Sequence, residues 1–203
     1  MSQPTILIAV PTFENICPET FKSIYGLQSN NYILKFDYVK GYDCAKARNE
    51  IVRRAREQKF DYILMVDSDI IVPSDAVKLL MEDPGDIRTA VYPRKNTAIG
   101  DTEMFKDDDF NYVHRYTFPE INDILENGEN RIKIKGCGLG CALIKTSIFD
   151  ALPFPWFKYV TYDNGEVLSE DLYFCSMVNY VGLKVEADLR VRCKHLVRWF
   201  QES

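Results

Sequence analysis

The run YILMV at Tyr62–Val66 is apolar without alternation and is followed directly by two carboxylates, Asp67 and Asp69. A strand that is apolar on both faces is typical of the centre of a parallel sheet covered by helices on both sides. Ionised carboxylates are seldom buried without a partner, so this strand end either reaches solvent or meets a positive charge. The run therefore predicts an α/β fold and draws attention to one edge of its sheet.

The rest of the chain alternates between strand-like and helix-like segments. Short apolar runs predict strands, and stretches rich in helix formers with one apolar face predict helices. Strands are expected at 5–10, 33–39, 62–66, 88–93, 141–145 and 183–192, and helices at 18–27, 45–58, 73–81 and 169–180. This alternation predicts a Rossmann-like α/β fold with a mainly parallel central sheet flanked by helices.

Length and composition favour a single domain over residues 1–203. A chain of 203 residues that is 46% hydrophobic can bury one sizeable core. Residues 94–131 are less regular and include the acidic run DDDF at Asp107–Phe110. We expect a mobile loop or insertion there, with a small subdomain as the alternative.

The charge balance and the start of the chain exclude several classes of protein. A net charge of −5 and a pI near 5.2 argue against a general affinity for nucleic acid or anionic membranes, although a local basic pocket remains compatible. No apolar stretch reaches the length of a membrane span, and MSQPTILIAVPTFE lacks the features of a signal peptide. We therefore expect a cytoplasmic protein without a transmembrane segment.

The cysteines form no C-x-x-C pair, and we interpret them as buried thiols. A metal or disulfide pair of Cys137 and Cys141 is the alternative. The six are Cys17, Cys44, Cys137, Cys141, Cys175 and Cys193.

Asp67 and Asp69 are two residues apart in an extended segment, so their side chains project to the same side. One cation can contact both. In open parallel sheets ligands bind at the carboxyl ends of the strands, which is where this pair lies. The alternative is that the two aspartates start a loop, cap the turn at Pro73-Ser74 or simply contact water.

Two further features place ionisable groups at expected element ends. Ser169-Glu170-Asp171 begins a helix, where Ser is a good N-cap and acidic residues suit the helix dipole. A carboxylate there that faces the ligand edge of the sheet could instead act as a general base. His195 ends the last apolar strand, and with Asp67 and Asp69 it would form an incomplete shell for a divalent cation.

Six motifs, taken in their order along the chain, resemble those of nucleotide-sugar-dependent glycosyltransferases of the A-type (GT-A) fold, most closely the family 2-like group. The resemblance spans nearly the whole chain, and its strength lies in six motifs at workable spacing. They are IAVPTFE, AKARNEIVRRA, LMVDSDIIVP (the D-x-D motif), GLGCALIKTSIFDAL, SEDLYFC and VGLKVEADLRVRCKHL.

The resemblance implies a hexosyltransferase-like enzyme that binds a nucleoside diphosphate sugar, with uridine as the expected base. Phe13 stands where the family often has Tyr, so a hydroxyl contact is lost. For Arg48, a solvated position on its helix is the alternative. The residues expected to contact the donor are Pro11, Thr12, Phe13, Glu14, Asp43, Arg48, Asp67, Ser68 and Gly138.

The resemblance also implies Mn²⁺ or Mg²⁺ at Asp69, Asp67 and His195. Asp69 is the expected direct ligand, while Asp67 is either a second ligand or a contact to the ribose or a metal-bound water. The cation would neutralise charge on the departing nucleoside diphosphate. Lys194 or Arg198 would add positive charge near the phosphates.

Asp171 matches the general base of inverting members of the family, and Glu170 would orient the acceptor or a loop. Gly138 and Gly140 would allow the backbone close to the donor sugar. A retaining reaction remains the alternative, because some retaining A-type enzymes carry the same motifs.

The acceptor, whether a glycan, a protein or a small molecule, is left open by the sequence. We expect its recognition by residues 94–131 and by PFPWFKYVTY at 153–162, where Trp156 and Phe157 either stack on a sugar or seal the core.

Rival functions from other classes are less well supported. A degenerate domain that binds a sugar nucleotide or a partner without turnover is the main one. A haloacid-dehalogenase-type phosphatase and a sugar-nucleotide pyrophosphorylase fit poorly, because the aspartate pair follows about 60 residues of α/β chain and PTFENICP replaces a glycine-rich loop.

Overall fold

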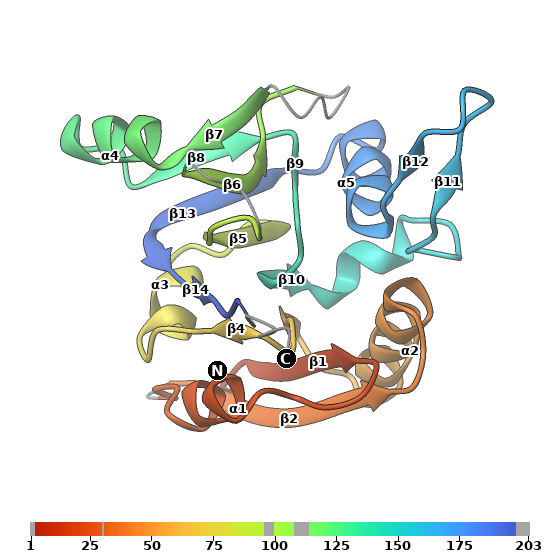
Figure 1. Ribbon diagram of the computed structural model, residues 1–203. Helices are drawn as coiled ribbons and strands as arrows, with labels where there is room; N and C mark the ends of the chain where they lie inside the picture. Colours follow the sequence, from red (N-terminus) through yellow and green to blue (C-terminus); the bar gives the residue numbers. More distant parts are fainter. Residues whose placement is uncertain (1–2, 30, 96–99, 108–113, 198–203) are drawn as a thin grey trace, which may run out of the picture.

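A seven-stranded sheet forms the centre of the computed structural model, which describes residues 3–29, 31–95, 100–107 and 114–197 (Figure 1). Across the sheet the strands are β2 (Ile33–Lys40), β1 (Thr5–Thr12), β3 (Tyr62–Val66), β10 (Cys141–Lys145), β5 (Ile87–Val91), β13 (Val185–Arg192) and β8 (Arg131–Ile134). β1, β2, β3, β5 and β13 run in one direction, whereas β10 is antiparallel to both its neighbours and β8 is antiparallel to β13. The expected mainly parallel α/β sheet is therefore confirmed.

Helices cover both faces of the sheet, which explains the non-alternating run at Tyr62–Val66. Ile63 and Met65 enter a core with α2 (Cys44–Glu57) and α5 (Glu170–Tyr180). Leu64 and Val66 enter a second core with α1 (Pro18–Tyr25) and α3 (Ala76–Leu80). Each fully buried side chain of this size stabilises the fold by ~1.5–3 kcal/mol, so both faces of β3 contribute.

An N-terminal cap fixes the start of α2, and the apolar face of the helix packs into the core. The Asp43 carboxylate caps the helix by accepting a hydrogen bond from the Lys46 N–H at 2.9 Å. Its buried face includes Ile51, Val52 and Ala55, as the sequence predicts. Arg48 lies on this buried side as well, which becomes important for the site.

The described residues of 94–131 form short strands and a helix, while 96–99 and most of the acidic run at 107–110 lie outside the described residues. β6 (Asp101–Phe105) pairs with β7 (Arg115–Thr117) and with β9 (Gly136–Cys137), and α4 (Phe118–Glu126) follows. A capping box starts α4, since the Thr117 hydroxyl and the Glu120 carboxylate each accept from the other residue's backbone N–H. In Figure 1 these short strands and α4 lie at the end of the sheet opposite to β2.

Short pairings complete the chain and correct other boundaries. β4 (Ile70–Ile71) pairs with β14 (Lys194–His195), and β11 (Val160–Thr161) pairs with β12 (Val167–Leu168). α3 begins at Ala76 rather than at Pro73-Ser74, and a 3₁₀ helix covers Thr146–Asp150. No helix in the described part of the chain is long and apolar enough to cross a membrane.

The structure decides between the two alternatives for Trp156 and Phe157, and it corrects the prediction for one of the cysteines. Trp156 and Phe157 are buried against Phe149, so they seal the core and are not available to stack on a sugar. All six cysteines are free thiols, which excludes a Cys137–Cys141 disulfide, and Cys44 is exposed rather than buried.

Candidate functional site

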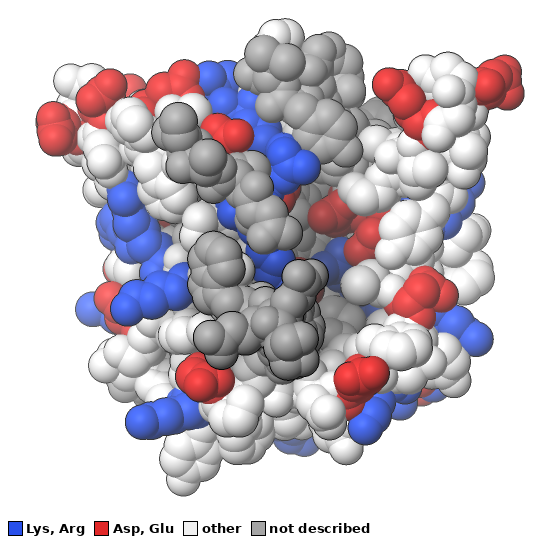
Figure 2. All heavy atoms as spheres, in the orientation of Figure 1, with Lys and Arg blue, Asp and Glu red and all other residues white. Residues whose placement is uncertain are grey.

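The candidate site lies where β1 and β3 end and where α5 begins. Asp67 follows β3 directly, and its N–H donates to the Gly140 carbonyl at 2.9 Å. β14 pairs antiparallel with β4, which brings His195 opposite Ile70 and next to Asp69. Figure 2 shows acidic and basic side chains close together in the middle of this face.

Arg48 joins two of the predicted acidic residues. It is only 2% exposed, which excludes the solvated alternative. Its Nη2 donates to Asp67 Oδ1 at 2.9 Å, and its Nη1 donates to Glu170 Oε1. Burial lowers the pKa of Arg48, but the charges of Asp67 and Glu170 raise it by more, so the guanidinium stays charged.

Asp69 has two basic neighbours, Lys95 and His195. Lys95 Nζ donates to Asp69 Oδ2, and His195 Nε2 lies 3.4 Å from Asp69 Oδ1. Burial raises the pKa of Asp69, but the hydrogen bonds from His195 and Lys95 lower it to about 2. Asp69 is therefore a charged acceptor under all ordinary conditions.

His195 is oriented by contacts on both sides of its ring. Its Nδ1 donates to the Pro93 carbonyl at 2.8 Å, so Nε2 is the nitrogen that faces Asp69. The Tyr92 ring packs edge-on against the imidazole at a centroid distance of 5.9 Å. Burial lowers the pKa of His195, while hydrogen bonds with Asp69 and Pro93 raise it above its usual value.

Asp69 and His195 together fit a divalent cation, whereas Asp67 is otherwise engaged. A separation of 3.4 Å between Asp69 Oδ1 and His195 Nε2 suits two adjacent ligands of one cation, and the Pro93 contact fixes the required tautomer. Asp67 Oδ1 is held by Arg48. Within the described residues no three His, Cys, Asp or Glu side chains are grouped to hold a metal ion. Oxygen atoms of a ligand and water would have to complete such a shell.

Asp171 presents one free carboxylate oxygen at the start of α5. Its Oδ1 accepts from the Ser169 hydroxyl and from the Leu172 N–H at 2.8 Å. No hydrogen bond to its Oδ2 occurs among the described residues. Ser169 therefore orients Asp171 instead of capping the helix through its side chain. Burial raises the pKa of the neighbouring Glu170, and Arg48 lowers it.

Gly138 and Gly140 make room for Tyr92. A methyl group at Gly138 would lie 2.4 Å from the Tyr92 hydroxyl oxygen, and one at Gly140 would lie 2.9 Å from its ring. The Gly140 N–H donates to that hydroxyl at 2.9 Å. Packing of Tyr92 thus explains both glycines, and their expected approach to a donor sugar stays a prediction.

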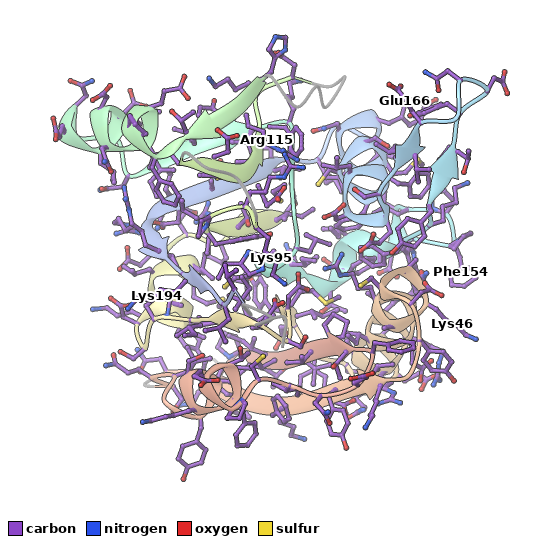
Figure 3. The ribbon with its side chains drawn as sticks, in the orientation of Figure 1. Lys46, Lys95, Arg115, Phe154, Glu166 and Lys194 are labelled. Carbon is purple, nitrogen blue, oxygen red and sulfur yellow. The ribbon has the colours of Figure 1, made fainter. Side chains whose placement is uncertain are left out.

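Several residues of this site belong to none of the motifs recognised in the sequence. Lys95, Tyr92 and Pro93 follow β5, whose carboxyl end lies at the same sheet edge as Asp67. Position after an apolar strand was the available signal. Figure 3 shows Lys95 near the middle of this face with Arg115 above it, whereas Lys194 lies to the left of both. Arg198 lies outside the described residues.

Three of the residues expected to contact the base and ribose, Thr12, Phe13 and Glu14, form part of the wall of a cavity beside Asp69. This cavity has a volume of about 420 Å³ and is bordered by Phe13, which is 71% exposed. Its other lining residues are Thr12, Glu14, Asn15, Cys17, Ser68, Asp69, Lys95, Leu196 and Val197. Pro11 and Asp43 do not line it; Asp43 is the cap of α2.

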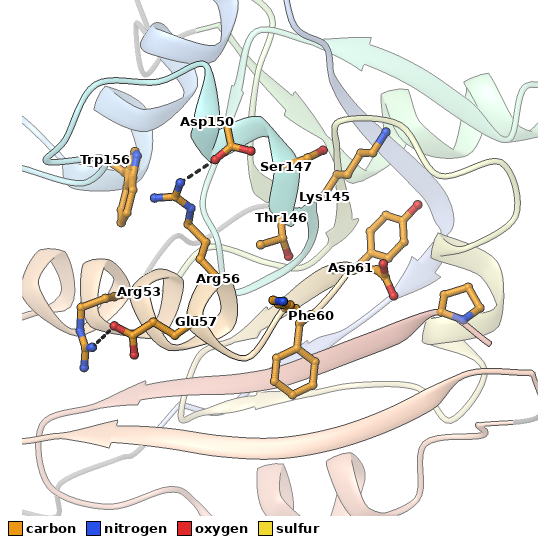
Figure 4. A pocket seen from close by; sticks show the side chains of 13 residues that line it. Arg53, Arg56, Glu57, Phe60, Asp61, Lys145, Thr146, Ser147, Asp150 and Trp156 are labelled. Carbon is orange, nitrogen blue, oxygen red and sulfur yellow. Dashed lines mark hydrogen bonds and ion pairs between the residues drawn. The ribbon is translucent and has the colours of Figure 1, made fainter. Parts of the chain in front are cut away.

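A larger cavity of about 810 Å³ lies elsewhere (Figure 4). It is lined by Asp61 and Tyr62, at the start of β3, whereas the site lies at the other end of that strand. Its arginines are already paired, with Arg56 Nη2 at 2.5 Å from Asp150 Oδ1. Size alone therefore does not locate the functional site.

Comparisons with known proteins agree with this geometry. A family model described as Glycosyl transferase family 2 matches residues 30–152. A197 from STIV has a TM-score of 0.64 at 15% identity, over 95% of this chain and 86% of A197. GalNAc-T7, solved with UDP, GalNAc and Mn²⁺, has a TM-score of 0.62 at 12% identity.

TarS 1–349 from S. aureus, solved with UDP-GlcNAc, has a TM-score of 0.56 at 12% identity. The alignments cover 95% and 97% of this chain, but 44% of the GalNAc-T7 chain and 60% of the TarS chain. At these identities the likeness shows a common GT-A fold. No curated protein sequence matches the chain.

Proposed function

Because the chain belongs to glycosyl transferase family 2, we propose that it moves a sugar from a nucleoside diphosphate sugar to an acceptor hydroxyl with inversion at the anomeric carbon. UDP-sugars are the expected donors. The solved structures of GalNAc-T7 with UDP and of TarS with UDP-GlcNAc support this choice. The acceptor is a glycan, a protein or a small molecule.

One arrangement carries the proposal: Asp69 and His195 face each other beside a cavity, and Asp171 lies at the same end of the sheet. The cavity of about 420 Å³ is large enough for part of a nucleotide, and it has Asp69 in its wall. Thr12, Phe13 and Glu14 border it after β1, where the base and ribose would bind. Exposed Phe13 offers a ring face for the base.

Asp69 and His195 would hold Mn²⁺ or Mg²⁺, which would neutralise negative charge on the departing diphosphate. Lys95 would lie beside the phosphates as a second positive charge, since it lines the cavity and contacts Asp69. Asp67 would keep its bond to Arg48 and approach the ribose, which favours the second of its two expected roles.

Asp171 would take the proton from the acceptor hydroxyl as that oxygen attacks the sugar. Its free Oδ2 and its fixed orientation by Ser169 support this role. Glu170 would act indirectly, because its carboxylate is committed to Arg48. Together they connect the acceptor side of the site at α5 with the donor side at β3.

A screen of nucleotide sugars tests the proposal. Purified protein is incubated with each donor with and without Mn²⁺, and both thermal stabilisation and release of nucleoside diphosphate are measured. We expect one donor to stabilise the protein only with metal, and Asp69→Asn to abolish this effect. Equal stabilisation without metal would contradict the metal site, and absence of release with every donor and acceptor would favour a binding domain without turnover. NMR of the product's anomeric proton distinguishes inversion from retention.

A further inference from the structure

β2 is an edge strand whose outward backbone groups can be identified. The Ile33 N–H donates to the Pro4 carbonyl at 2.9 Å, and the Gly41 N–H donates to the Thr12 carbonyl at 3.1 Å. Odd-numbered residues of β2 therefore direct their backbone groups toward β1, and even-numbered residues direct theirs away from the sheet. In Figure 1 β2 lies at the lower margin of the sheet, and no strand of the described residues lies beyond it. Such an edge can accept another strand.

Aromatic side chains are exposed along this edge. Phe21, Phe36 and Tyr38 are 49%, 39% and 50% exposed. The rings of Phe21 and Phe36 meet at a centroid distance of 5.7 Å, so α1 and β2 present one continuous apolar surface. A groove of about 340 Å³ runs beside Phe21 and Phe36. Contiguous exposed apolar surface of this kind is typical of an interaction site.

The charges of Lys35 and Asp37 on β2 favour a second copy of the same strand as the partner, and they favour one alignment of the two strands. In an antiparallel pair of two β2 strands with Phe36 opposite Phe36, Lys35 of each copy lies opposite Asp37 of the other. Shifting the centre of the pair to Lys35 would place two lysines opposite each other, and shifting it to Asp37 would place two aspartates opposite each other. Opposite charges across strands stabilise a pair and like charges destabilise it.

The outward direction of the backbone groups of even-numbered residues in β2 is compatible with the register that has Phe36 opposite Phe36. With Phe36 on the two-fold axis, Phe36 pairs with Phe36, and Leu34 pairs with Tyr38, through outward N–H and C=O groups. Lys35 and Asp37 then form the closely spaced, non-hydrogen-bonded pairs in which side chains approach best. We propose that two copies of this chain form a two-fold dimer by antiparallel pairing of their β2 strands.

Contacts in the single chain are compatible with this pairing. Asp37 Oδ2 accepts from Arg54 Nη1 at 2.9 Å, and its Oδ1 accepts from the Tyr38 N–H at 2.8 Å. On pairing, the Tyr38 N–H would donate to the Leu34 carbonyl of the second copy, and Oδ1 would turn to Lys35. Arg54 can keep its bond. The Tyr38 carbonyl, which Arg54 reaches at 3.5 Å, can accept a second hydrogen bond.

A charge-swap experiment tests the dimer. Light scattering after size-exclusion chromatography should give a dimer for the wild type, and monomers for Lys35→Glu and for Asp37→Lys. A mixture of these two variants should give a heterodimer, because each strand then meets its charge complement at both positions. Lys40→Glu changes the same charge on β2 outside the Lys35–Asp37 pairs, and it should remain dimeric.

Cross-linking provides a second readout that does not depend on the folding of Asp37→Lys. Phe36→Cys places one thiol at the two-fold axis, where opposite Cα atoms lie ~5.5 Å apart, within disulfide range. Mild oxidation should yield a disulfide-linked dimer. Ser147→Cys should not, because Ser147 lies in the 3₁₀ helix after β10, and β1 and β3 separate β10 from β2. A monomeric wild type, a dimer unaffected by Lys35→Glu, or no cross-link at position 36 would each overturn the proposal.

Discussion

The buried guanidinium of Arg48 bonds the Asp67 carboxylate at 2.9 Å and thereby ties helix α2 to the end of strand β3. The same guanidinium bonds Glu170 at the start of α5. One side chain thus connects three elements that are far apart in sequence. Loss of it would leave two carboxylates without their cation.

We therefore expect Arg48→Met to reduce the free energy of unfolding by ~3–5 kcal/mol, because it leaves carboxylates unpaired in a largely buried place. Urea denaturation measures the loss. Arg53→Met is the matched control on the same helix: Arg53 is 53% exposed, so solvent screens its ion pairs and the substitution should have a much smaller effect. Equal effects of the two substitutions would contradict the assigned role of Arg48.

Lys95→Met should strengthen Mn²⁺ binding in the absence of nucleotide, because Lys95 competes for Asp69. A partly exposed ion pair contributes ~1 kcal/mol, which corresponds to roughly fivefold in affinity. Isothermal titration calorimetry with Mn²⁺ alone measures the change. Lys194→Met removes an exposed lysine adjacent to His195 and should leave the affinity unchanged; an unchanged affinity in Lys95→Met would argue against competition.

Asp171→Asn should lower the rate of sugar transfer by ~10²–10⁴-fold, because the amide cannot accept the acceptor's proton. Binding of the nucleotide sugar, measured by thermal shift, should remain close to that of the wild type. Ser169→Ala should cause a smaller loss, since it removes only the hydroxyl that orients Asp171. Full activity of Asp171→Asn would mean that another residue is the general base.

Gly138→Ala should destabilise the protein by ~1–3 kcal/mol, because the added methyl group would meet the Tyr92 hydroxyl. The same substitution in a Tyr92→Phe background should cost less, since the atom at 2.4 Å is then absent. Thermal unfolding of the double-mutant cycle measures this coupling. Gly26→Ala, where the nearest atoms are at 3.5 Å, is the control and should show no such penalty.

The carboxylate of Asp188 should make the free energy of unfolding depend on pH in the acidic range. It is fully buried, and Arg131 and Arg190 donate to it at 3.0 and 2.6 Å. Burial raises the pKa of Asp188, but these hydrogen bonds bring it below its ordinary value of 3.8. A lowered pKa in the folded state stabilises the protein above pH 3.8, and the contribution is lost as the pH falls through the folded value.

Asp188→Asn should therefore be less stable than the wild type at pH 7 and show a smaller further loss between pH 4 and pH 2. Urea denaturation across this range measures both. Asp163→Asn, an exposed carboxylate in the turn between β11 and β12, should follow the wild-type curve. If Asp188→Asn lowered the free energy of unfolding by the same amount at every pH, the pKa of Asp188 would not differ between the folded and unfolded states.

Sequence periodicity identified most of the large strands and helices because their apolar faces repeat within each element. It was less informative at 94–131, where β7 spans only three residues and the helix α4, which begins after the capping box of Thr117 and Glu120, was not predicted. Trp156 and Phe157 illustrate another limit. Aromatic residues suit both a binding surface and a core, and only their packing against Phe149 distinguishes the two.

The sequence by itself determined the α/β class, the position of Asp67 and Asp69 at a strand end, and the start of a helix at Glu170-Asp171, because these depend on local pattern. The role of Asp171 as general base stays a prediction that the family resemblance implies. The tertiary structure decided which charges meet. Lys95 reaches Asp69 because β5 ends at the same edge as β3, although β10 lies between them. His195 faces Asp69 because β14 folds back onto β4. Strand order and chain reversal leave no periodic trace in the sequence, so Lys95 was found as a partner of Asp69 only in the folded chain, whereas His195 was already expected beside Asp69.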